Sequence, residues 1–213
     1  KGGFPAEIKL SSLNGSNGFT LIGNENYAAT GSSIDLIGDI NSDGFQDIAV
    51  ITSGSGAVNG KCFVVYGRTG GFPAILRTFE LNGTNGFTIE GDASTGKLGR
   101  SVSGLGDVNG DGIADIALGS YNGSEQKRKY VVFGRSNNFP ANFNIAALNG
   151  TNGFIIENSE TALDSYNGIG KAGDLNNDGI NDIAITGQYV LFGKTVFPVL
   201  VDLKNLDGTN GFK

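Results

Sequence analysis

The chain of 213 residues contains no histidine, methionine or tryptophan, one cysteine and four prolines. Without histidine, the sequence excludes Ser-His-Asp and Cys-His nucleophile systems and any histidine-ligated zinc or haem site. The single cysteine, Cys62, excludes an intramolecular disulfide and a CxxC redox pair. No apolar run approaches the ~20 residues of a membrane span. These absences exclude the enzyme mechanisms that depend on histidine or on paired cysteines, and they argue against membrane insertion.

Basic residues are also few. The 15 Lys and Arg against 21 Asp and Glu give a net charge of −6. Binding to nucleic acid phosphates needs a basic surface, so we expect no nucleic acid partner. Glycine, in contrast, is abundant at 36 residues, and abundant glycine among turn-like dipeptides prompts a search for internal repeats.

Three signatures recur in the same order. GDINSDGFQDIA at residues 38–49 returns as GDVNGDGIADIA at 106–117 and as GDLNNDGINDIA at 173–184, with offsets of 68 and 67 residues. An aromatic-Val-(Val or Leu)-aromatic-Gly signature follows each of them. A third, LNG(S or T)NGF, begins at Leu13, Leu81 and Leu148 and returns as LDGTNGF at Leu206. One order and one period make chance an implausible explanation.

Each unit contains four short strand-like runs and no helical stretch; in the middle unit they cover residues 100–105, 115–119, 129–133 and 153–156. We therefore predict an all-β fold made of β-propeller blades of four antiparallel strands, in about three tandem repeats of ~67 residues. A β-sandwich of short strands is the alternative, but it gives no reason for a fixed period. The expected units of a partial or assembling propeller over 1–213 are an outer strand in 1–22 and blades at 23–90, 91–157 and 158–213, the last incomplete.

The repeated acidic segment has the pattern D-x-N-x-D-G-x-x-D. It places carboxylate or amide oxygens at positions 1, 3, 5 and 9 and a glycine at position 6, where the chain turns. Ca2+ prefers about 6 to 8 oxygen ligands, and the carbonyl at position 7 can supply another. Positions 1 to 6 match an EF-hand loop, but position 12 holds Val50, Leu118 or Ile185 in place of Glu. We expect the position 9 Asp to take the bidentate role in a β-hairpin calcium loop.

The order of Leu98-Gly99, the acidic loop at 107–115, IALGS at 116–120 and YVVFG at 130–134 resembles the FG-GAP repeat of integrin α-subunit propellers and of many secreted bacterial proteins. The resemblance covers essentially the whole chain. It implies that each loop joins the first and second strands of a blade and binds Ca2+ for structural reasons. The ligands carried over at the three sites are Asp39, Asn41, Asp43, the Phe45 carbonyl and Asp47; Asp107, Asn109, Asp111, the Ile113 carbonyl and Asp115; and Asp174, Asn176, Asp178, the Ile180 carbonyl and Asp182.

Some positions depart from the family pattern. The Phe-Gly position reads Thr30-Gly31 in the first unit and Ser165-Tyr166 in the third, and the Gly-Ala-Pro position reads Gly119-Ser120-Tyr121 in the second. Three repeats are also fewer than the ~4 to 8 blades of closed propellers. Two arrangements remain open: the chain is a window of a longer array with further blades in cis, or a second chain closes the ring in trans.

Strand parity assigns the loops to two ends. The loops between strands 1 and 2 and between strands 3 and 4 share the calcium end, whereas the 2–3 and 4–1 loops share the other end. The second set varies between units, as a recognition face on a rigid frame would; simple solvated loops are the alternative, and the charge run at 127–129 favours solvation. The candidate ligand-binding residues are Asn24, Tyr27, Tyr121, Lys127, Arg128, Asp164 and Tyr166.

Two further features have structural explanations. Asn14, Asn82, Asn122 and Asn149 begin N-x-(S or T) sequons, but three of them belong to the LNG signature, so a turn role explains them better than a glycan. Cys62 lies next to a predicted strand, and we expect its side chain to be buried as a small apolar group.

The leading functional hypothesis is a calcium-stabilised, non-catalytic propeller module for adhesion or recognition, binding a protein or glycan ligand at the cell surface. The alternatives are a lectin-like, carbohydrate-binding propeller and an accessory domain of a larger secreted enzyme. Calcium loops of this type fill where free Ca2+ is high, which favours an extracellular or cell-surface location.

Overall fold

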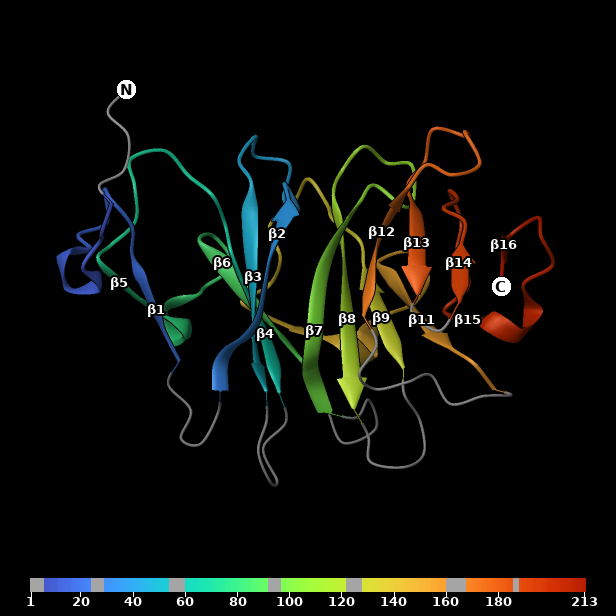
Figure 1. The fold of residues 1–213 in the computed structure, drawn as a ribbon, viewed down its shortest axis with the longest axis horizontal. Helices are drawn as coiled ribbons and strands as arrows, with labels where there is room; N and C mark the ends of the chain where they lie inside the picture. The colour runs from blue at the N-terminus through green and yellow to red at the C-terminus, as the bar shows by residue number, and fades with distance from the viewer. Residues whose placement is uncertain are drawn as a thin grey trace.

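The structure is a computed structural model that describes residues 6–23, 29–53, 60–91, 97–121, 128–159, 168–185 and 188–213. It is all-β and fits a β-propeller-like fold, as the sequence predicts. The sheets stand side by side in chain order along the long axis, from the blue N-terminal part to the red C-terminal part (Figure 1).

The middle sheet contains the four strands that the sequence predicts, paired antiparallel in the order β7-β8-β9-β11, and a fifth short strand, β15, that joins β11 in parallel. Its strands are β7 (Lys97–Gly106), β8 (Asp115–Tyr121), β9 (Lys129–Val132), β11 (Gly153–Glu157) and β15 (Leu200–Asp202).

The first sheet repeats this arrangement, with β10 in the place of β15. Its strands are β2 (Ala29–Gly38), β3 (Asp47–Ser53), β4 (Lys61–Val65), β6 (Gly86–Glu90) and β10 (Asn142–Asn144). The third sheet has the antiparallel order β12-β13-β14-β16, and its strands are β12 (Ile169–Gly173), β13 (Asp182–Ile185), β14 (Tyr189–Leu191) and β16 (Gly211–Phe212). A fourth, two-stranded sheet pairs β1 (Thr20–Ile22) with β5 (Ile75–Arg77).

The first strand of each sheet ends in the same bulge. The pairing register shifts just before Gly38, Gly106 and Gly173, and each of these glycines has a positive φ, between 72 and 86°. A left-handed residue at this point favours glycine and bends the strand away from its partner. The bulge thereby directs the chain into the acidic loop that follows.

The connection between the third and fourth strands is more ordered than the sequence predicts. It holds a three-residue parallel strand and a one-turn 3-10 helix, and the expectation of no helical stretch is therefore wrong. Elements of three residues are too short to show a periodicity in sequence. The 3-10 turns are η1 (Leu10–Ser12), η2 (Thr78–Glu80), η3 (Ile145–Ala147) and η4 (Leu203–Asn205). In the described part of the chain, no helix has the length and apolar character that crossing a bilayer requires.

Two apolar cores hold the three large sheets together. One lies between the first and middle sheets and includes Phe87 and Tyr130; the other lies between the middle and third sheets and includes Phe154 and Ile183. The middle sheet is thus covered on both faces, which a two-layer β-sandwich does not allow. Each of these two interfaces between sheets also contains a pair of stacked aromatic rings, Phe87–Phe139 and Phe154–Phe197, with ring centroids 4.1 Å apart in both.

Candidate metal centres

The acidic loops are residues 39–47, 107–115 and 174–182, each joining the first and second strands of a sheet. In the first loop, the Asp39 carboxylate accepts hydrogen bonds from the backbone N–H groups of Asp43 (3.0 Å) and Gly44 (2.7 Å). Gly44 has a φ of 89°, the left-handed conformation that explains glycine at position 6. The side chain at position 1 therefore fixes the turn by hydrogen bonding to its own loop.

Positions 3 and 5 contact each other in all three loops. The Asn41 Nδ2 donates to Asp43 Oδ2 at 2.8 Å, and Asp43 Oδ1 accepts from the Phe45 N–H at 2.9 Å. The same two bonds, 2.8 to 2.9 Å long, recur in the second and third loops. The three copies are therefore alike in side-chain geometry as well as in sequence.

The position 9 carboxylate has a structural role that the sequence analysis missed. Asp47 is fully buried, and its two oxygens accept from the N–H groups of Ile40 (2.9 Å) and Gly67 (2.8 Å). It thus ties the loop to the glycine that ends the aromatic signature of the third strand. Asp115 and Asp182 are equally buried and make the equivalent pairs of bonds, 2.7 to 2.9 Å long.

We call this pair of backbone hydrogen bonds to the position 9 carboxylate the clamp. The sequence did contain a signal for it, the glycine that ends the aromatic signature. A Cβ on Gly67 would lie 2.4 Å from the Gln46 carbonyl oxygen, so only glycine lets its N–H reach Asp47. Gly134 and Gly193 are confined in the same way, at 2.3 and 2.4 Å from backbone oxygens. The recurring glycine is thus part of the loop architecture.

Burial makes two of these carboxylates hard to ionise without a cation. Loss of hydration raises the pKa of Asp47 to about 6 and that of Asp115 to about 8, against the lowering effect of their backbone hydrogen bonds. The negative charges of the position 5 and position 1 carboxylates add to the increase. The three acids of a loop therefore lie close enough to repel one another.

The loops fit Ca2+ in donor type. Asp39 Oδ1 and Asn41 Oδ1 both approach the Asp43 N–H, at 3.0 and 3.3 Å, so the two oxygens face a common point. Among the described residues, no three Asp, Glu, Cys or His side chains are grouped so that they could hold a metal ion by themselves. A Ca2+ site in these loops would therefore also need the amide oxygen at position 3 and the carbonyl at position 7. Each Asp47 oxygen accepts one N–H and keeps a further lone pair for a cation. Oxygen-only donors are the ligands that Ca2+ prefers.

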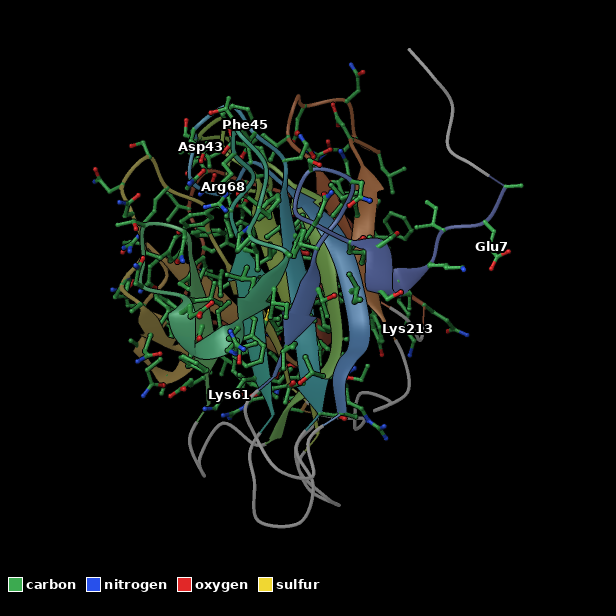
Figure 2. The ribbon with its side chains drawn as sticks, turned by 90° about the vertical axis from the view of Figure 1, so that its left-hand side faces the viewer. Glu7, Asp43, Phe45, Lys61, Arg68 and Lys213 are labelled. Carbon is green, nitrogen blue, oxygen red and sulfur yellow. The ribbon has the colours of Figure 1, made fainter. Side chains whose placement is uncertain are left out.

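The two ends of a sheet differ as strand parity predicts. Asp43, Phe45 and Arg68 lie toward one end, and Lys61 lies toward the other (Figure 2). Of the candidate ligand-binding residues at the second end, Asn24, Tyr27, Lys127, Asp164 and Tyr166 lie outside the described residues, and of Tyr121 only the backbone is described, as the last residue of β8.

The expectation that the charge run at 127–129 is solvated is wrong for Lys129, whereas Arg128 is partly exposed. Arg128 Nε donates to Glu157 Oε2 at 3.1 Å, and Lys129 is 1% exposed. Neighbouring strand residues point to opposite faces, and the middle sheet is covered on both. A charged residue in β9 is therefore buried whichever face it takes.

The sequon asparagines described by the structure shape turns. Asn82 Oδ1 accepts from the N–H and the hydroxyl of Thr84, at 2.9 and 2.7 Å. Asn14 and Asn149 make the equivalent bonds, and so does Asp207 in the fourth copy. An aspartate in the same role supports the turn explanation. Asn122 lies outside the described residues. Cys62 is fully buried, as predicted, and burial raises the pKa of its thiol.

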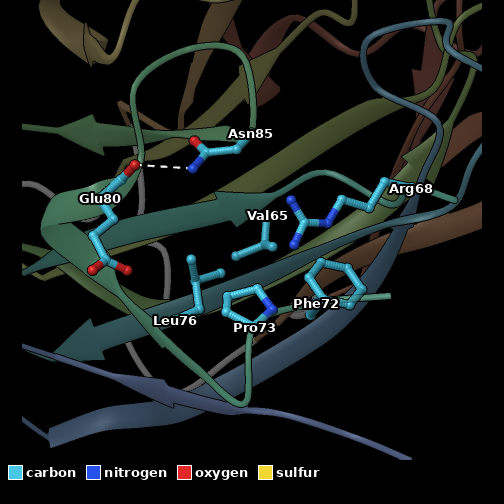
Figure 3. A pocket seen from close by; sticks show the side chains of 7 residues that line it. All are labelled: Val65, Arg68, Phe72, Pro73, Leu76, Glu80 and Asn85. Carbon is cyan, nitrogen blue, oxygen red and sulfur yellow. Dashed lines mark hydrogen bonds between the residues drawn. The ribbon is translucent and has the colours of Figure 1, made fainter. Parts of the chain in front are cut away.

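A pocket of about 160 Å³ lies on the outer side of the first sheet (Figure 3). Val132 and Phe139 occupy the same repeat positions in the middle sheet as Val65 and Phe72 in the pocket, and both belong to the core against the first sheet. The pocket is thus the counterpart of a contact between sheets, and beside it Phe19 of the N-terminal segment stacks on Phe72 with ring centroids 4.3 Å apart, as Phe87 stacks on Phe139. Its lining residues are Val65, Arg68, Phe72, Pro73, Leu76, Glu80 and Asn85.

Comparison with known proteins agrees with this architecture. Residues 98–135 match the FG-GAP repeat family. Integrin alpha-4 of Xenopus laevis is 30% identical over 104 residues, which are 48% of this chain and 10% of that protein. Integrin alpha-6 of Gallus gallus is 32% identical over 139 residues, 60% of this chain and 12% of that protein. Integrin alpha-2 of Bos taurus is 32% identical over 94 residues, 44% of this chain and 8% of that protein.

The chain therefore spans about a tenth of the length of the curated relatives it matches. The matched family segment contains the second acidic loop and the aromatic signature, and both recur in the first and third sheets. On these grounds, residues 98–135 form an FG-GAP repeat, and integrin α-subunits are among the relatives of the chain.

Proposed function

We propose that the chain is a calcium-stabilised, non-catalytic β-propeller module that serves extracellular adhesion or recognition. The observation that carries the proposal is the threefold recurrence of one acidic loop, with the same hydrogen bonds in every copy, in a relative of integrin α-subunits. Each repeat forms one blade, and one Ca2+ binds in each loop.

Calcium binding offsets the charge that the fold concentrates. Nine of the 21 acidic residues lie in the three loops, and in each loop one of the three carboxylates is fully buried. A bound Ca2+ would supply positive charge beside these carboxylates. Its ligands in the first loop would be the side chains of Asp39, Asn41, Asp43 and Asp47 and the carbonyl of Phe45. Because the unfolded chain holds no such site, metal binding adds to the free energy of unfolding.

The location and the non-catalytic role follow from the relatives and the ligand chemistry. Integrin α relatives are cell-surface proteins, and extracellular calcium modules bind at ~0.1 to 1 mM Ca2+. In such a module the acidic residues of the loops bind metal and form the hydrogen bonds that order the loop, and they have no catalytic role. We therefore place the chain outside the cell or on its surface.

The ligand of the module is a protein or glycan, bound by the loops at the end opposite the calcium sites. A second interaction involves the outer face of the first sheet. Ile34 and Leu36 are 62% and 64% exposed there, whereas Val102, which matches Ile34 in the middle sheet, is 6% exposed. Further blades in cis, or a second chain in trans, would cover this face.

Calorimetric titration of the chelator-treated chain with Ca2+ tests the metal. We expect three bound ions and much weaker binding of Mg2+. The control is the triple variant Asp43→Asn, Asp111→Asn, Asp178→Asn, which replaces the position 5 carboxylate in each loop by a neutral amide of similar shape. Absence of calcium binding to the unmodified chain, or equal binding to the triple variant, would remove calcium from the proposal.

Recognition needs a separate test. A glycan array and a panel of extracellular matrix proteins, each probed in Ca2+ and in chelator, distinguish the two ligand classes. Calcium-dependent binding to matrix protein supports adhesion, whereas binding confined to glycans would assign the lectin-like alternative. No binding to either panel would contradict a recognition role.

A further inference from the structure

Adjacent acidic loops contact each other directly through the backbone. The Ala114 N–H of the second loop donates to the Asp39 carbonyl of the first loop at 3.3 Å, and the Asn181 N–H of the third loop donates to the Asp107 carbonyl of the second at 2.9 Å. A second bond accompanies each contact, from Arg135 N–H to the Ile40 carbonyl at 3.0 Å and from Lys194 N–H to the Val108 carbonyl at 3.1 Å. The loops thus form a row in which each is bonded to the next.

The donors in this row belong to peptide units that include proposed metal ligands. Ala114 is at position 8 of its loop, so its N–H shares a peptide unit with the carbonyl of Ile113 at position 7. This peptide is trans, and the N–H and C=O of a trans peptide point in opposite directions. When the N–H faces the first loop, the carbonyl therefore faces away from it. The Ile180–Asn181 peptide bears the same relation to the second and third loops.

The acceptors also belong to proposed ligand residues. Asp39 and Asp107 stand at position 1, where the carboxylate orders the loop and the main-chain carbonyl accepts from the neighbouring loop. One peptide unit and one hydrogen bond thus connect a proposed ligand of one site to the main chain of a proposed ligand residue of the next. Such a short covalent and hydrogen-bonded path can transmit a local change of polarity.

Glycine permits this approach. A Cβ on Gly38 would lie 2.6 Å from the Ala114 Cβ, and one on Gly106 would lie 2.6 Å from Asn181 Nδ2. Gly173 occupies the same position in the third repeat, with a similar φ of 77°, yet no described atom lies within 4 Å of its Cβ position. The three glycines therefore share a backbone conformation, but only two of them stand at a contact between loops.

We propose that the three loops bind Ca2+ with positive cooperativity between neighbours, transmitted through the Ile113–Ala114 and Ile180–Asn181 peptide units. This inference rests on the proposed calcium sites. Cation binding at the position 7 carbonyl polarises its peptide and strengthens the N–H as a donor to the preceding loop. That bond holds the position 1 residue of the preceding site in place. Linkage is reciprocal, so each site also favours the next.

Electrostatics between sites acts in the opposite direction. An occupied loop carries less negative charge than an empty one, so it attracts the next Ca2+ less strongly. Salt screens this effect, with a Debye length of about 8 Å at physiological ionic strength and about 3 Å at 1 M. Hydrogen-bond coupling depends much less on salt. The cooperativity measured in a titration should therefore increase as the salt concentration rises.

Native mass spectrometry of the full chain, titrated with Ca2+ at low and high ammonium acetate concentrations, measures the abundance of each loaded species. Near half saturation, we expect the empty and fully loaded chains to exceed what independent sites allow. The coupling between neighbours corresponds to about a two- to tenfold gain in affinity, the range of one hydrogen bond.

Two substitutions identify the path. Gly38→Ala inserts a methyl group between the first and second loops and replaces no proposed ligand, and Gly173→Ala imposes a comparable backbone penalty without the contact. We expect Gly38→Ala to increase the partly loaded species and to reduce the affinity of the first site two- to tenfold. Gly173→Ala should keep the distribution of the unmodified chain. Circular dichroism establishes that each variant is folded.

The outcomes separate the two proposals. Binding of three ions with an independent-site distribution at high salt would overturn cooperativity and leave the calcium sites in place. Binding of no ions would overturn the proposed function itself. Equal distributions for Gly38→Ala and the unmodified chain would also contradict the path, and if Gly38→Ala does not fold, the salt series on the unmodified chain still decides.

Discussion

The two ends of the sheets differ in how far their polar contacts are buried. At the acidic end, Asp47, Asp115 and Asp182 are all fully buried and make the same pair of backbone hydrogen bonds. At the opposite end, the described ion pairs Lys61–Glu90 and Arg128–Glu157 are partly exposed. The comparison teaches that one end specifies the fold by repetition and leaves the sequence of the other end free to vary.

Removing a buried clamp should have the largest effect. Asp115→Ala leaves the N–H groups of Val108 and Gly134 without their acceptor in a buried site. Each unpaired donor costs about 1 to 3 kcal/mol, so we expect a loss of about 3 kcal/mol in the free energy of unfolding. Urea denaturation in chelator measures this structural part alone. A loss below 1 kcal/mol would show that the clamp does not specify the fold.

Replacing an exposed residue that we propose as a Ca2+ ligand should lower the free energy of unfolding mainly when Ca2+ is present. We expect Asp111→Ala to lower the free energy of unfolding by about 2 to 3 kcal/mol at a Ca2+ concentration near 100 times the dissociation constant. In chelator the same variant should match the unmodified chain more closely than Asp115→Ala does. Urea denaturation with and without Ca2+ measures both free energies of unfolding. An equal loss in the two conditions would mean that Asp111 stabilises the metal-free fold, as Asp115 does.

Substitutions at Asn82 should have a smaller effect on stability, and the same chain supplies a control because Asp207 occupies the equivalent position in the fourth copy. Asn82→Ala removes the acceptor for both Thr84 bonds and should cost about 1 kcal/mol. Asn82→Asp keeps that acceptor and removes the sequon, and it should be close to neutral because Asp207 makes the same bonds in the fourth copy. Thermal denaturation of the two variants decides. Equal destabilisation by both would mean that the asparagine amide has another role.

The smallest effects belong to the opposite end. Lys61→Ala breaks a partly exposed ion pair with Glu90, 3.1 Å long, and should cost about 0.2 to 1 kcal/mol. Lys127 lies outside the described residues; from the sequence we expect Lys127→Ala to change the free energy of unfolding by no more than about 0.5 kcal/mol. Urea denaturation checks both variants. A cost comparable to that of Asp115→Ala would abolish the distinction between the ends.

The sequence predicts much of this architecture because its signals are local and repeated. The four strands of the middle sheet and the position of each acidic loop follow from one alignment of the chain with itself. The buried state of Cys62 follows from its place beside a strand. These features depend on residues close together in sequence.

Other features depend on distant partners. The clamp by Asp47 requires the Gly67 N–H, 20 residues away, and nothing within the acidic loop indicates it. The parallel strand β10 is only three residues long and acquires its partner from the preceding repeat. Lys129 is buried because neighbouring sheets cover both faces of its own, a fact that the basic sequence KRK at 127–129 conceals.

The most direct test of the central claim combines a calcium count with a melting curve on the same sample. We predict three Ca2+ per chain before chelation and none after it. Relative to saturating Ca2+, chelation should lower the melting temperature by on the order of 10 °C or more, given one occupied site per repeat, and added Mg2+ should not restore it. A melting curve that is the same in Ca2+ and in chelator would contradict the account.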